Sequence, residues 1–398
     1  MATDIKACFP FFKAHGDAVW LDGAATAQKP ACLSAALTEF YNKHASNVYR
    51  GEYPAADEAA RMFESARSTV AGWFGAKPER TAFTANATDS LNVAADILGR
   101  NVRAGDNVIV SPLEHNSALL PWMRLCGEKK AGLRFIPLLS DGTPDLSSLP
   151  SLTDTRTRAA VVTAGSNVNG WTAPLQEIGG FFSSRGVPLV IDAAQAAPHR
   201  AGLAEGTDFA FLCASAHKIY GPDGLGILIS GGDLSDTAGG RIGGGTVYSV
   251  SKSGYERKLG VAGLEAGTPN VAGAVAFAAV IDWLSSLDLR SLFREEERLA
   301  ALLREKLISL GMRTAPGGAS PLPVVSFDPG FMHPLDAARL LGSMGICVRA
   351  GKHCAHIAHD ALGFSSTLRA SFGIYNTESD VERLADALKF LKGRYGNV

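Results

Sequence analysis

The chain has 398 residues, of which 46% are hydrophobic and 19% are charged, so it can bury a sizeable core, and its length favours two or three domains. Its 38 Lys and Arg residues nearly balance 39 Asp and Glu residues, which gives no electrostatic basis for binding nucleic acid or an acidic membrane surface. It has no secretory signal pattern, no apolar stretch long enough to span a bilayer and six cysteines without CxxC pairing, so we expect a cytoplasmic protein without a disulfide framework.

Short runs of Val, Ile and Leu, separated by helical patterns, recur through the first two thirds of the chain. The runs cover residues 107–112, 133–139, 159–164, 187–192, 209–213 and 226–230. Continuous apolar runs, rather than alternation, are typical of a mostly parallel sheet with helices on both faces. We therefore predict a large α/β domain over residues 16–284, which ends in a buried apolar helix.

The pattern changes after residue 285. A long amphipathic helix stops at Gly311, and two strand–helix alternations follow it. The last helix begins with Thr377 and Asp380, which are placed as a capping box. These features predict a smaller α+β domain over residues 285–398, and we expect residues 1–15 to pack with it.

Polar residues gather where the predicted parallel strands end. They are His115, Asn167, Asp192, Gln195, Ser215, His217 and Lys218. Ligands of open α/β sheets bind beyond this edge. Upstream, Asn86 and Thr88 lie where a helix begins, and free N–H groups at a helix start suit a phosphate.

A lysine, a strand-end aspartate, a phosphate-type helix start and a histidine together match the cofactor pyridoxal 5'-phosphate. The Lys218 amine would condense with its aldehyde, and the Asp192 carboxylate would pair with its ring nitrogen. Each residue alone has a structural alternative: a solvated lysine, a helix-capping Asp192 and a structural His115. Their joint placement at one sheet edge favours the cofactor, with the Gly221–Pro222 turn fixing where Lys218 points.

Several longer motifs extend this interpretation. They are "WLDGAATAQKP", "NVYRGEYPAADEAARMFESAR", "LEHNSALLPW", "SNVNG", "IDAAQAAPH", "SAHKIYGPDG", "LEAGTPNVAG", "RAGKHCA" and "LRASFGIYNT". In this order they resemble the class V aminotransferase-type enzymes and, within them, the SufS/CsdA-like (group II) cysteine desulfurases and selenocysteine lyases. The resemblance covers nearly the whole chain and implies a pyridoxal-phosphate-dependent transferase of fold type I that forms a homodimer.

The resemblance also implies the roles of single residues. The cofactor-binding residues are Asn86, Thr88, His115, Asp192, Gln195, Ser215, His217, Lys218 and Thr268, the last of which reaches the cofactor of the neighbouring subunit. The substrate-binding residues are Ala24, Asn167, Arg349 and Arg369. Catalysis falls to Lys218, His115 and Cys354, without a metal. Because this chain has Ala85-Asn86-Ala87-Thr88 where the family commonly has Arg-Gly-Thr-Thr, one phosphate hydroxyl and a glycine are missing, and the phosphate must rely on Asn86, Thr88 and backbone N–H groups.

Cys354 decides the reaction class. A thiolate attacks sulfur, and the nearby Arg349, Lys352 and His353 would favour the thiolate form. The resemblance then implies a cysteine desulfurase that converts L-cysteine, or selenocysteine, to L-alanine. The persulfide left on Cys354 would pass to a SufE-like acceptor protein and serve iron–sulfur cluster assembly.

Alternatives stay open at this point. Another lyase, epimerase or aminotransferase of the same fold would not need Cys354, a selenocysteine lyase would prefer the selenium substrate, and a scaffold would bind the cofactor without turnover. A zinc site made by His353, His356, His359 and Cys354 is disfavoured, because three-residue steps drift around a helix and no second ligand cluster follows. The glycine-rich residues 241–250 are predicted as a mobile loop near the subunit interface.

Overall fold

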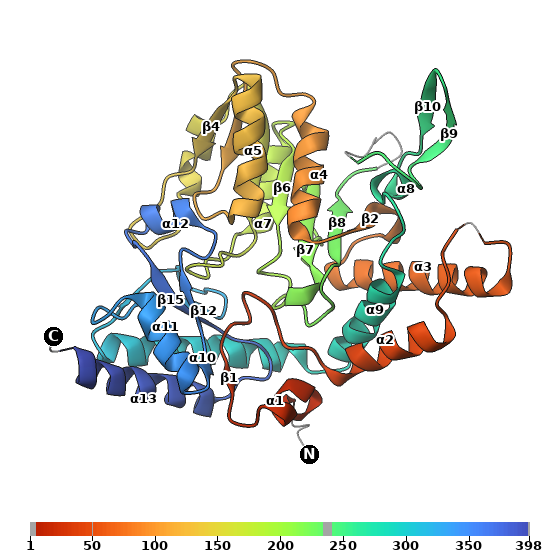
Figure 1. The fold of residues 1–398 in the computed structure, drawn as a ribbon. Coiled ribbons are helices and arrows are strands. Elements are labelled where there is room, and N and C mark those ends of the chain that lie inside the picture. The colour runs from red at the N-terminus through yellow and green to blue at the C-terminus, as the bar shows by residue number, and fades with distance from the viewer. Residues whose placement is uncertain (1–4, 50, 234–240, 397–398) are drawn as a thin grey trace.

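The computed structural model describes residues 5–49, 51–233 and 241–396. A seven-stranded sheet lies at the centre of its larger part, in the order β2-β8-β7-β6-β5-β3-β4 (Figure 1). The strands are β2 (Thr81–Thr84), β3 (Asn107–Val110), β4 (Gly132–Phe135), β5 (Thr157–Thr163), β6 (Leu189–Asp192), β7 (Phe211–Ser215) and β8 (Gly226–Ser230). All neighbouring strands pair in parallel except β8, which is antiparallel to both β2 and β7. The predicted α/β fold is confirmed.

Helices cover both faces of this sheet. Since successive residues of a strand point to opposite faces, the side chains of each strand enter two different cores. Val108 packs with α4 (Ala87–Gly99) and α5 (Asn116–Lys129) on one face. Ile109 belongs to the core of the other face. The helices of that face are α2 (Ala31–Lys43), α3 (Pro54–Phe74), α7 (Leu175–Ser183) and α9 (Val271–Ser285). A sheet covered in this way needs apolar residues at every position, which explains the continuous runs.

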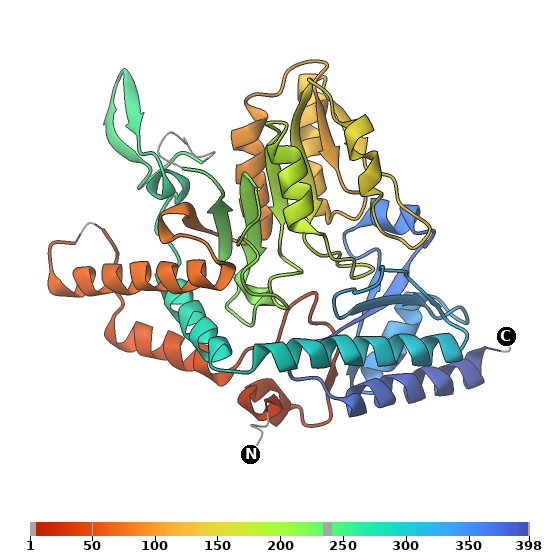
Figure 2. The same cartoon turned by 180° about the vertical axis from the view of Figure 1, so that it is seen from behind.

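A second apolar core lies in the C-terminal part of the chain. Its antiparallel sheet has the order β11-β12-β15-β14. The elements are α10 (Leu289–Ser309), β11 (Arg313–Thr314), β12 (Val324–Asp328), α11 (Pro334–Ser343), β14 (Arg349–Gly351), β15 (Thr367–Ser371) and α13 (Glu378–Tyr395). Figure 2 shows α10 and α13 lying side by side along the base of the molecule. The capping box of Thr377 and Asp380 is present at the start of α13.

The N-terminal segment joins this second core. Strand β1 (Val19–Trp20) pairs in parallel with β13 (Ile346–Cys347), and the side chains of Val19 and Leu21 pack in the C-terminal core. Phe9, just before α1 (Pro10–Ala14), stacks edge-on against the ring of Tyr375. Strand β1 lies within residues 16–284, the range predicted for the large domain, yet it pairs with a strand of the C-terminal part. The domain boundary at residue 16 stays a prediction.

Short elements complete the chain and connect the larger ones. They are η1 (Lys6–Cys8), η2 (Pro78–Arg80), η3 (Leu146–Ser148), α6 (Leu149–Leu152), η4 (Ala216–Lys218), β9 (Val247–Ser251), β10 (Gly254–Arg257), α8 (Val261–Leu264) and α12 (His356–Ala361). Strands β9 and β10 form a hairpin that projects from the body of the molecule (Figure 1). The prediction of a loop over residues 241–250 was thus wrong for the residues that enter β9.

The described part of the chain contains no single helix with the length and apolar character to cross a membrane. Helices α9 and α10 meet the combined requirement of length and apolar character only as a pair, and they are bent by 86° where they meet. Helix α9 is buried against α2 and α3, so its apolar composition serves the core, as predicted.

Candidate active site

A cavity of about 580 Å³ opens at the carboxyl ends of β5, β6 and β7. The structure brings nearly all of the predicted site residues to its wall, although they come from segments far apart in the sequence. They are Ala24, Asn86, Thr88, His115, Asn167, Asp192, Gln195, Ser215, His217, Lys218, Arg349, Cys354 and Arg369. Only Thr268 of the predicted set lies elsewhere.

Lys218 lines the cavity from the end of η4, the short helix that follows β7. Burial lowers the pKa of its amine to about 8, although the nearby Asp192 opposes this shift. The following turn admits only glycine at position 221, because a Cβ there would come within 2.3 Å of the ring of Phe277. Tyr220 adopts a left-handed backbone with φ of 59°. A turn that depends on glycine therefore follows Lys218, and its role in directing the lysine side chain stays a prediction.

Asp192 ends β6 and is buried at the cavity wall. Its Oδ1 accepts a hydrogen bond of 2.9 Å from the Ala194 N–H, so the carboxyl also caps its own turn. Burial raises the pKa of Asp192, while the Ala194 N–H and Lys218 act in the opposite direction. A neighbouring carboxyl, Glu114, was missed by the sequence analysis. Burial and the proximity of Asp192 raise the pKa of Glu114 well above its usual value, so Asp192, the one beside Lys218, ionises more readily.

The start of α4 forms one end of the cavity. The Asn86 side chain caps this helix by accepting a 2.9 Å hydrogen bond from the Asp89 N–H. The Ser215 hydroxyl accepts a 2.7 Å bond from the Ala87 N–H, and the Thr88 hydroxyl lies 2.7 Å from that of Ser117. The strand β8 packs closely here, because a Cβ at Gly226 would lie 2.5 Å from the Asn86 backbone. Hydroxyls and N–H groups thus converge on one end of the cavity, as an anion requires.

Two histidines face this region in their neutral form. Burial, with contributions from Lys218, lowers the pKa of both His115 and His217 to about 4. His115 caps α5 through its Nδ1, which accepts a 3.1 Å hydrogen bond from the Ser117 N–H. His115 is therefore at once a structural cap and a wall of the cavity. Ser117, which contacts both His115 and Thr88, is a further residue that sequence reasoning missed.

Two arginines of the cavity wall meet at one carboxylate, that of Asp22. Arg349 forms a 2.8 Å ion pair with Asp22, and the buried Arg369 lies 3.4 Å from the same carboxylate. Burial lowers the pKa of Arg369 to about 10, so its guanidinium stays charged at neutral pH. The Arg369 Nε has no hydrogen-bond partner among the described residues. Asp22 was not singled out from the sequence, although the motif "WLDGAATAQKP" contains it.

Cys354 lies on a tight loop at the mouth of the cavity. Its backbone and that of His353 both have left-handed φ angles, of 53° and 48°. Two asparagines hold this loop: the Asn116 N–H donates to the Cys354 carbonyl at 2.6 Å, and the Asn167 amide donates to the His353 carbonyl at 2.8 Å. All six cysteines lie in the described residues, none of them forms a disulfide, and only Cys354 is exposed. Its thiol is therefore the accessible one.

The expected cationic surroundings of Cys354 need correction. Lys352 forms a 2.7 Å ion pair with Asp360, and burial lowers the pKa of His353 to about 2, so its ring is uncharged. The cationic groups that act on the thiol are Lys218, Arg369 and Arg349, the last of which is shared with Asp22. His353 and His359 instead bind the Thr367 hydroxyl. Within residues 5–49, 51–233 and 241–396, no three His, Cys, Asp or Glu side chains are grouped to hold a metal ion.

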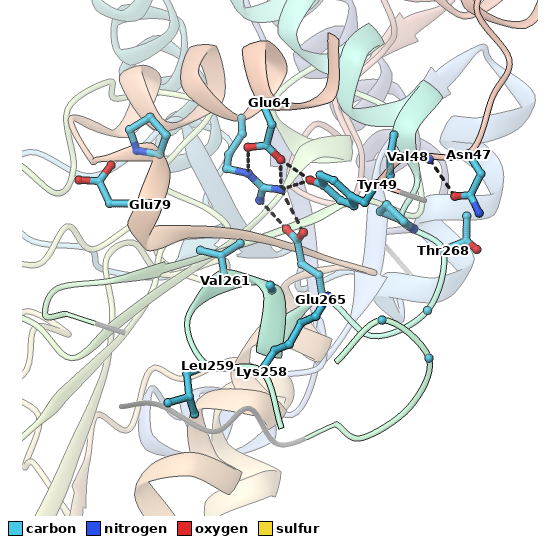
Figure 3. Close-up of a pocket in the computed structure, with 17 residues that line it drawn as sticks. Asn47, Val48, Tyr49, Glu64, Glu79, Lys258, Leu259, Val261, Glu265 and Thr268 are labelled. Atoms are coloured by element: carbon cyan, nitrogen blue, oxygen red, sulfur yellow. Dashed lines mark hydrogen bonds and ion pairs between the residues drawn. The ribbon is translucent and has the colours of Figure 1, made fainter. Parts of the chain in front are cut away.

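Thr268 lines a second, larger cavity of about 830 Å³ (Figure 3). Here the charged groups satisfy one another: the Arg67 guanidinium pairs with both Glu64 and Glu265, and Tyr49 bonds to Glu64. The ion pairs raise the pKa of Arg67, so it stays protonated. This cavity lacks the lysine–aspartate pair of the first, which leaves the smaller one as the candidate active site.

Comparisons with known proteins agree with this geometry. Residues 19–384 match the family described as aminotransferase class-V. The cysteine desulfurase CsdA of Escherichia coli (strain K12) is 36% identical over 390 residues, which are 97% of this chain and 96% of that protein. A solved structure of cysteine desulfurase from Thermococcus onnurineus NA1 has a TM-score of 0.92 at 33% identity and covers 100% of this chain and 99% of that one. The solved structure of the Escherichia coli CsdA has a TM-score of 0.91 at 34% identity, with 98% of each chain covered.

Proposed function

This chain belongs to the class-V aminotransferase family, and we propose that it is a pyridoxal 5'-phosphate-dependent cysteine desulfurase. It would convert L-cysteine to L-alanine and leave the sulfur as a persulfide on Cys354. One observation carries this proposal: a single cavity combines a half-buried lysine, a buried aspartate and a buried arginine with the only exposed cysteine of the chain. The relatives named cysteine desulfurase support it over nearly their whole length.

The residues present fit this cofactor. The buried Gln195 Oε1 has no hydrogen-bond partner among the described residues, and such an atom is costly unless a ligand completes it. Asp192 would hold the ring nitrogen, and His115 would pack against the ring. Thr88, Ser215 and the N–H groups at the start of α4 would hold the phosphate. When bound, the cofactor supplies an electron sink for charge that develops at the substrate Cα.

The protein's own side chains supply the remaining steps. Arg369 and Asn167 would orient the substrate carboxylate, with a two-pronged contact from the guanidinium. Lys218, whose pKa is about 8, is suited to remove and return a proton near neutral pH. The Cys354 thiolate would then attack the substrate sulfur. The new S–S bond forms as the substrate C–S bond breaks, and protonation of the carbon gives L-alanine.

The attachment of the cofactor should depend on pH through Lys218. Only the free amine condenses with an aldehyde, and its fraction rises with pH until the pKa is passed. With a pKa of about 8, the rate of attachment to the full-length apoprotein should rise roughly 50-fold from pH 6 to pH 8 and level off above about pH 9. Mass spectrometry after borohydride quenching at fixed times measures this rate. A rate that still climbs tenfold per pH unit at pH 9, as for an ordinary lysine, would contradict it.

The reaction itself is tested by the products formed from L-cysteine. We expect equal amounts of L-alanine and transferable sulfur, together with a mass increase of one sulfur atom on the Cys354 peptide. Selenocysteine, assayed in parallel, separates a desulfurase from a selenocysteine lyase by the ratio of their kcat/KM values. Pyruvate and ammonia in place of alanine would contradict the proposal and indicate a different lyase.

We also propose that the protein works as a homodimer and passes sulfur to a SufE-like acceptor protein. The exposed hairpin residues Tyr248, Val250 and Tyr255 support a partner surface, because large apolar side chains are seldom left in water together. Thr268 would reach the cofactor of the neighbouring subunit from beside this hairpin. None of the six cysteines forms a disulfide, which suits the reducing cytoplasm that we propose as its location.

A further inference from the structure

A buried carboxyl group lies behind the candidate active site without a part in the chemistry described above. Glu296 projects from α10 and is 1% exposed. It does not line the cavity. Carboxyl groups are almost never fully buried unless they are paired. The partners of Glu296 therefore indicate what it does.

The carboxyl binds two segments that also present predicted site residues. Its Oε2 lies 2.8 Å from the Nδ1 of His199, in the segment that follows Asp192 at the end of β6. Its Oε1 accepts a 3.4 Å hydrogen bond from the hydroxyl of Tyr220, in the turn that follows Lys218 at the end of β7. One side chain from the C-terminal part thus contacts both strand-end segments of the large sheet.

Tyr220 extends this connection to a third segment. Its hydroxyl also accepts a 3.1 Å hydrogen bond from the Ile374 N–H, which follows Arg369 and the end of β15. Burial and the nearby Glu296 raise the pKa of Tyr220 well above its usual value, so the phenol keeps its proton and can donate it. The phenol therefore joins the Lys218 turn to the strand that presents Arg369.

The Tyr220 backbone needs such support. A bulky residue in the left-handed region is strained and persists only where its surroundings hold it. The Phe9 ring lies 5.9 Å from the Tyr220 ring and the Tyr375 ring lies 6.2 Å from it. Packing fixes the ring, while the two hydrogen bonds fix the hydroxyl. They add to the backbone bonds that the Ile219 and Gly221 N–H groups donate to the Ala216 carbonyl within the turn.

We propose that Glu296, acting through Tyr220 and His199, is a positioning residue that holds the Lys218 and Asp192 segments in register with the strand of Arg369. The proposal rests on the proposed function, because that function gives Lys218 and Arg369 their roles. It assigns no contact with substrate or cofactor to Glu296 itself. Loss of the Tyr220 hydroxyl or of the Glu296 carboxylate should make the Lys218 turn more mobile without removing apolar side chains from the core.

The test compares Tyr220→Phe and Glu296→Gln with Glu297→Gln, which alters the exposed neighbour on the same helix. Two quantities are measured on the full-length protein. Hydrogen exchange of the peptide over residues 216–221 is followed without cofactor, and the rate of pyridoxal phosphate attachment to Lys218 is followed after its addition. Both variants should exchange about tenfold faster in this peptide and attach the cofactor about tenfold more slowly, while Glu297→Gln behaves as the unaltered protein.

The double variant tests whether the Tyr220 hydroxyl and the Glu296 carboxylate act together. If the hydroxyl and the carboxylate act as one connection, Tyr220→Phe with Glu296→Gln should match the larger single effect instead of their product. Unchanged exchange and attachment in both single variants would overturn the proposal. A lower melting temperature with unchanged exchange in this peptide would also overturn it, because that result indicates a merely structural role. Failure of the unaltered protein to attach the cofactor would refute the proposed function, while the exchange measurement would still decide the role of Glu296.

Discussion

Lys218→Ala is expected to lose covalent attachment of pyridoxal phosphate entirely and to lower desulfuration of L-cysteine by about 10²–10⁴-fold or more. The lysine is the one amine in the cavity wall, and burial has already lowered its pKa to about 8, which suits both the condensation and proton transfer. No neighbouring side chain in that wall offers a second amine. Bound cofactor is measured by mass spectrometry after borohydride reduction, and turnover by alanine release.

The fold should survive this substitution. Burial disfavours the charged form of Lys218, as its lowered pKa shows, so removal of the amine should leave the melting temperature unchanged or raise it. Lys389→Ala, on the exposed face of α13, is the matched control and should retain both attachment and turnover. Persistent attachment in Lys218→Ala would show that another lysine carries the cofactor.

Cys354→Ala should remove the transferable sulfur and reduce alanine formation from L-cysteine by about 10²-fold or more. Without the thiol, nothing at the cavity mouth can accept the substrate sulfur, since the other five cysteines are buried or half-buried. Attachment of the cofactor to Lys218 should not change, because the Cys354 thiol takes no part in the condensation of the amine with the aldehyde. Turnover is followed by alanine release, and the persulfide by the mass of the Cys354 peptide.

Cys32→Ala provides the control for this experiment. Cys32 is half-buried on α2, outside the candidate active site, so its loss should leave the rate within about twofold of the unaltered protein. Full turnover of L-cysteine by Cys354→Ala would exclude the desulfurase mechanism. It would favour another lyase or aminotransferase of the same fold.

Features that depend on neighbours in the sequence could be predicted well. The six apolar runs became strands because a sheet covered on both faces needs apolar side chains at every position. The capping box at Thr377 depends on residues within one turn of the helix. The short strand β2 escaped notice, since its four residues carry threonine at both ends.

Features that depend on long-range pairing could not be read from the sequence. The role of Asp22 becomes visible only in the fold, where β1 pairs with β13 and Asp22 itself forms a bridge with Ser371 at the end of β15, so that its carboxylate meets Arg349 and Arg369. Glu114 and Glu296 look like ordinary charged residues until their burial is known. The charge near Cys354 was predicted from three neighbouring cations. The structure pairs Lys352 with Asp360 and buries His353 in its neutral form.

The most direct test of the account is to reduce the purified protein with borohydride in the presence of pyridoxal phosphate and to map the modified peptide. The account predicts one added pyridoxyl group per chain, on Lys218 in the peptide that contains "SAHKIYG". A colourless protein that takes up no label, or a label on any other lysine, would contradict it.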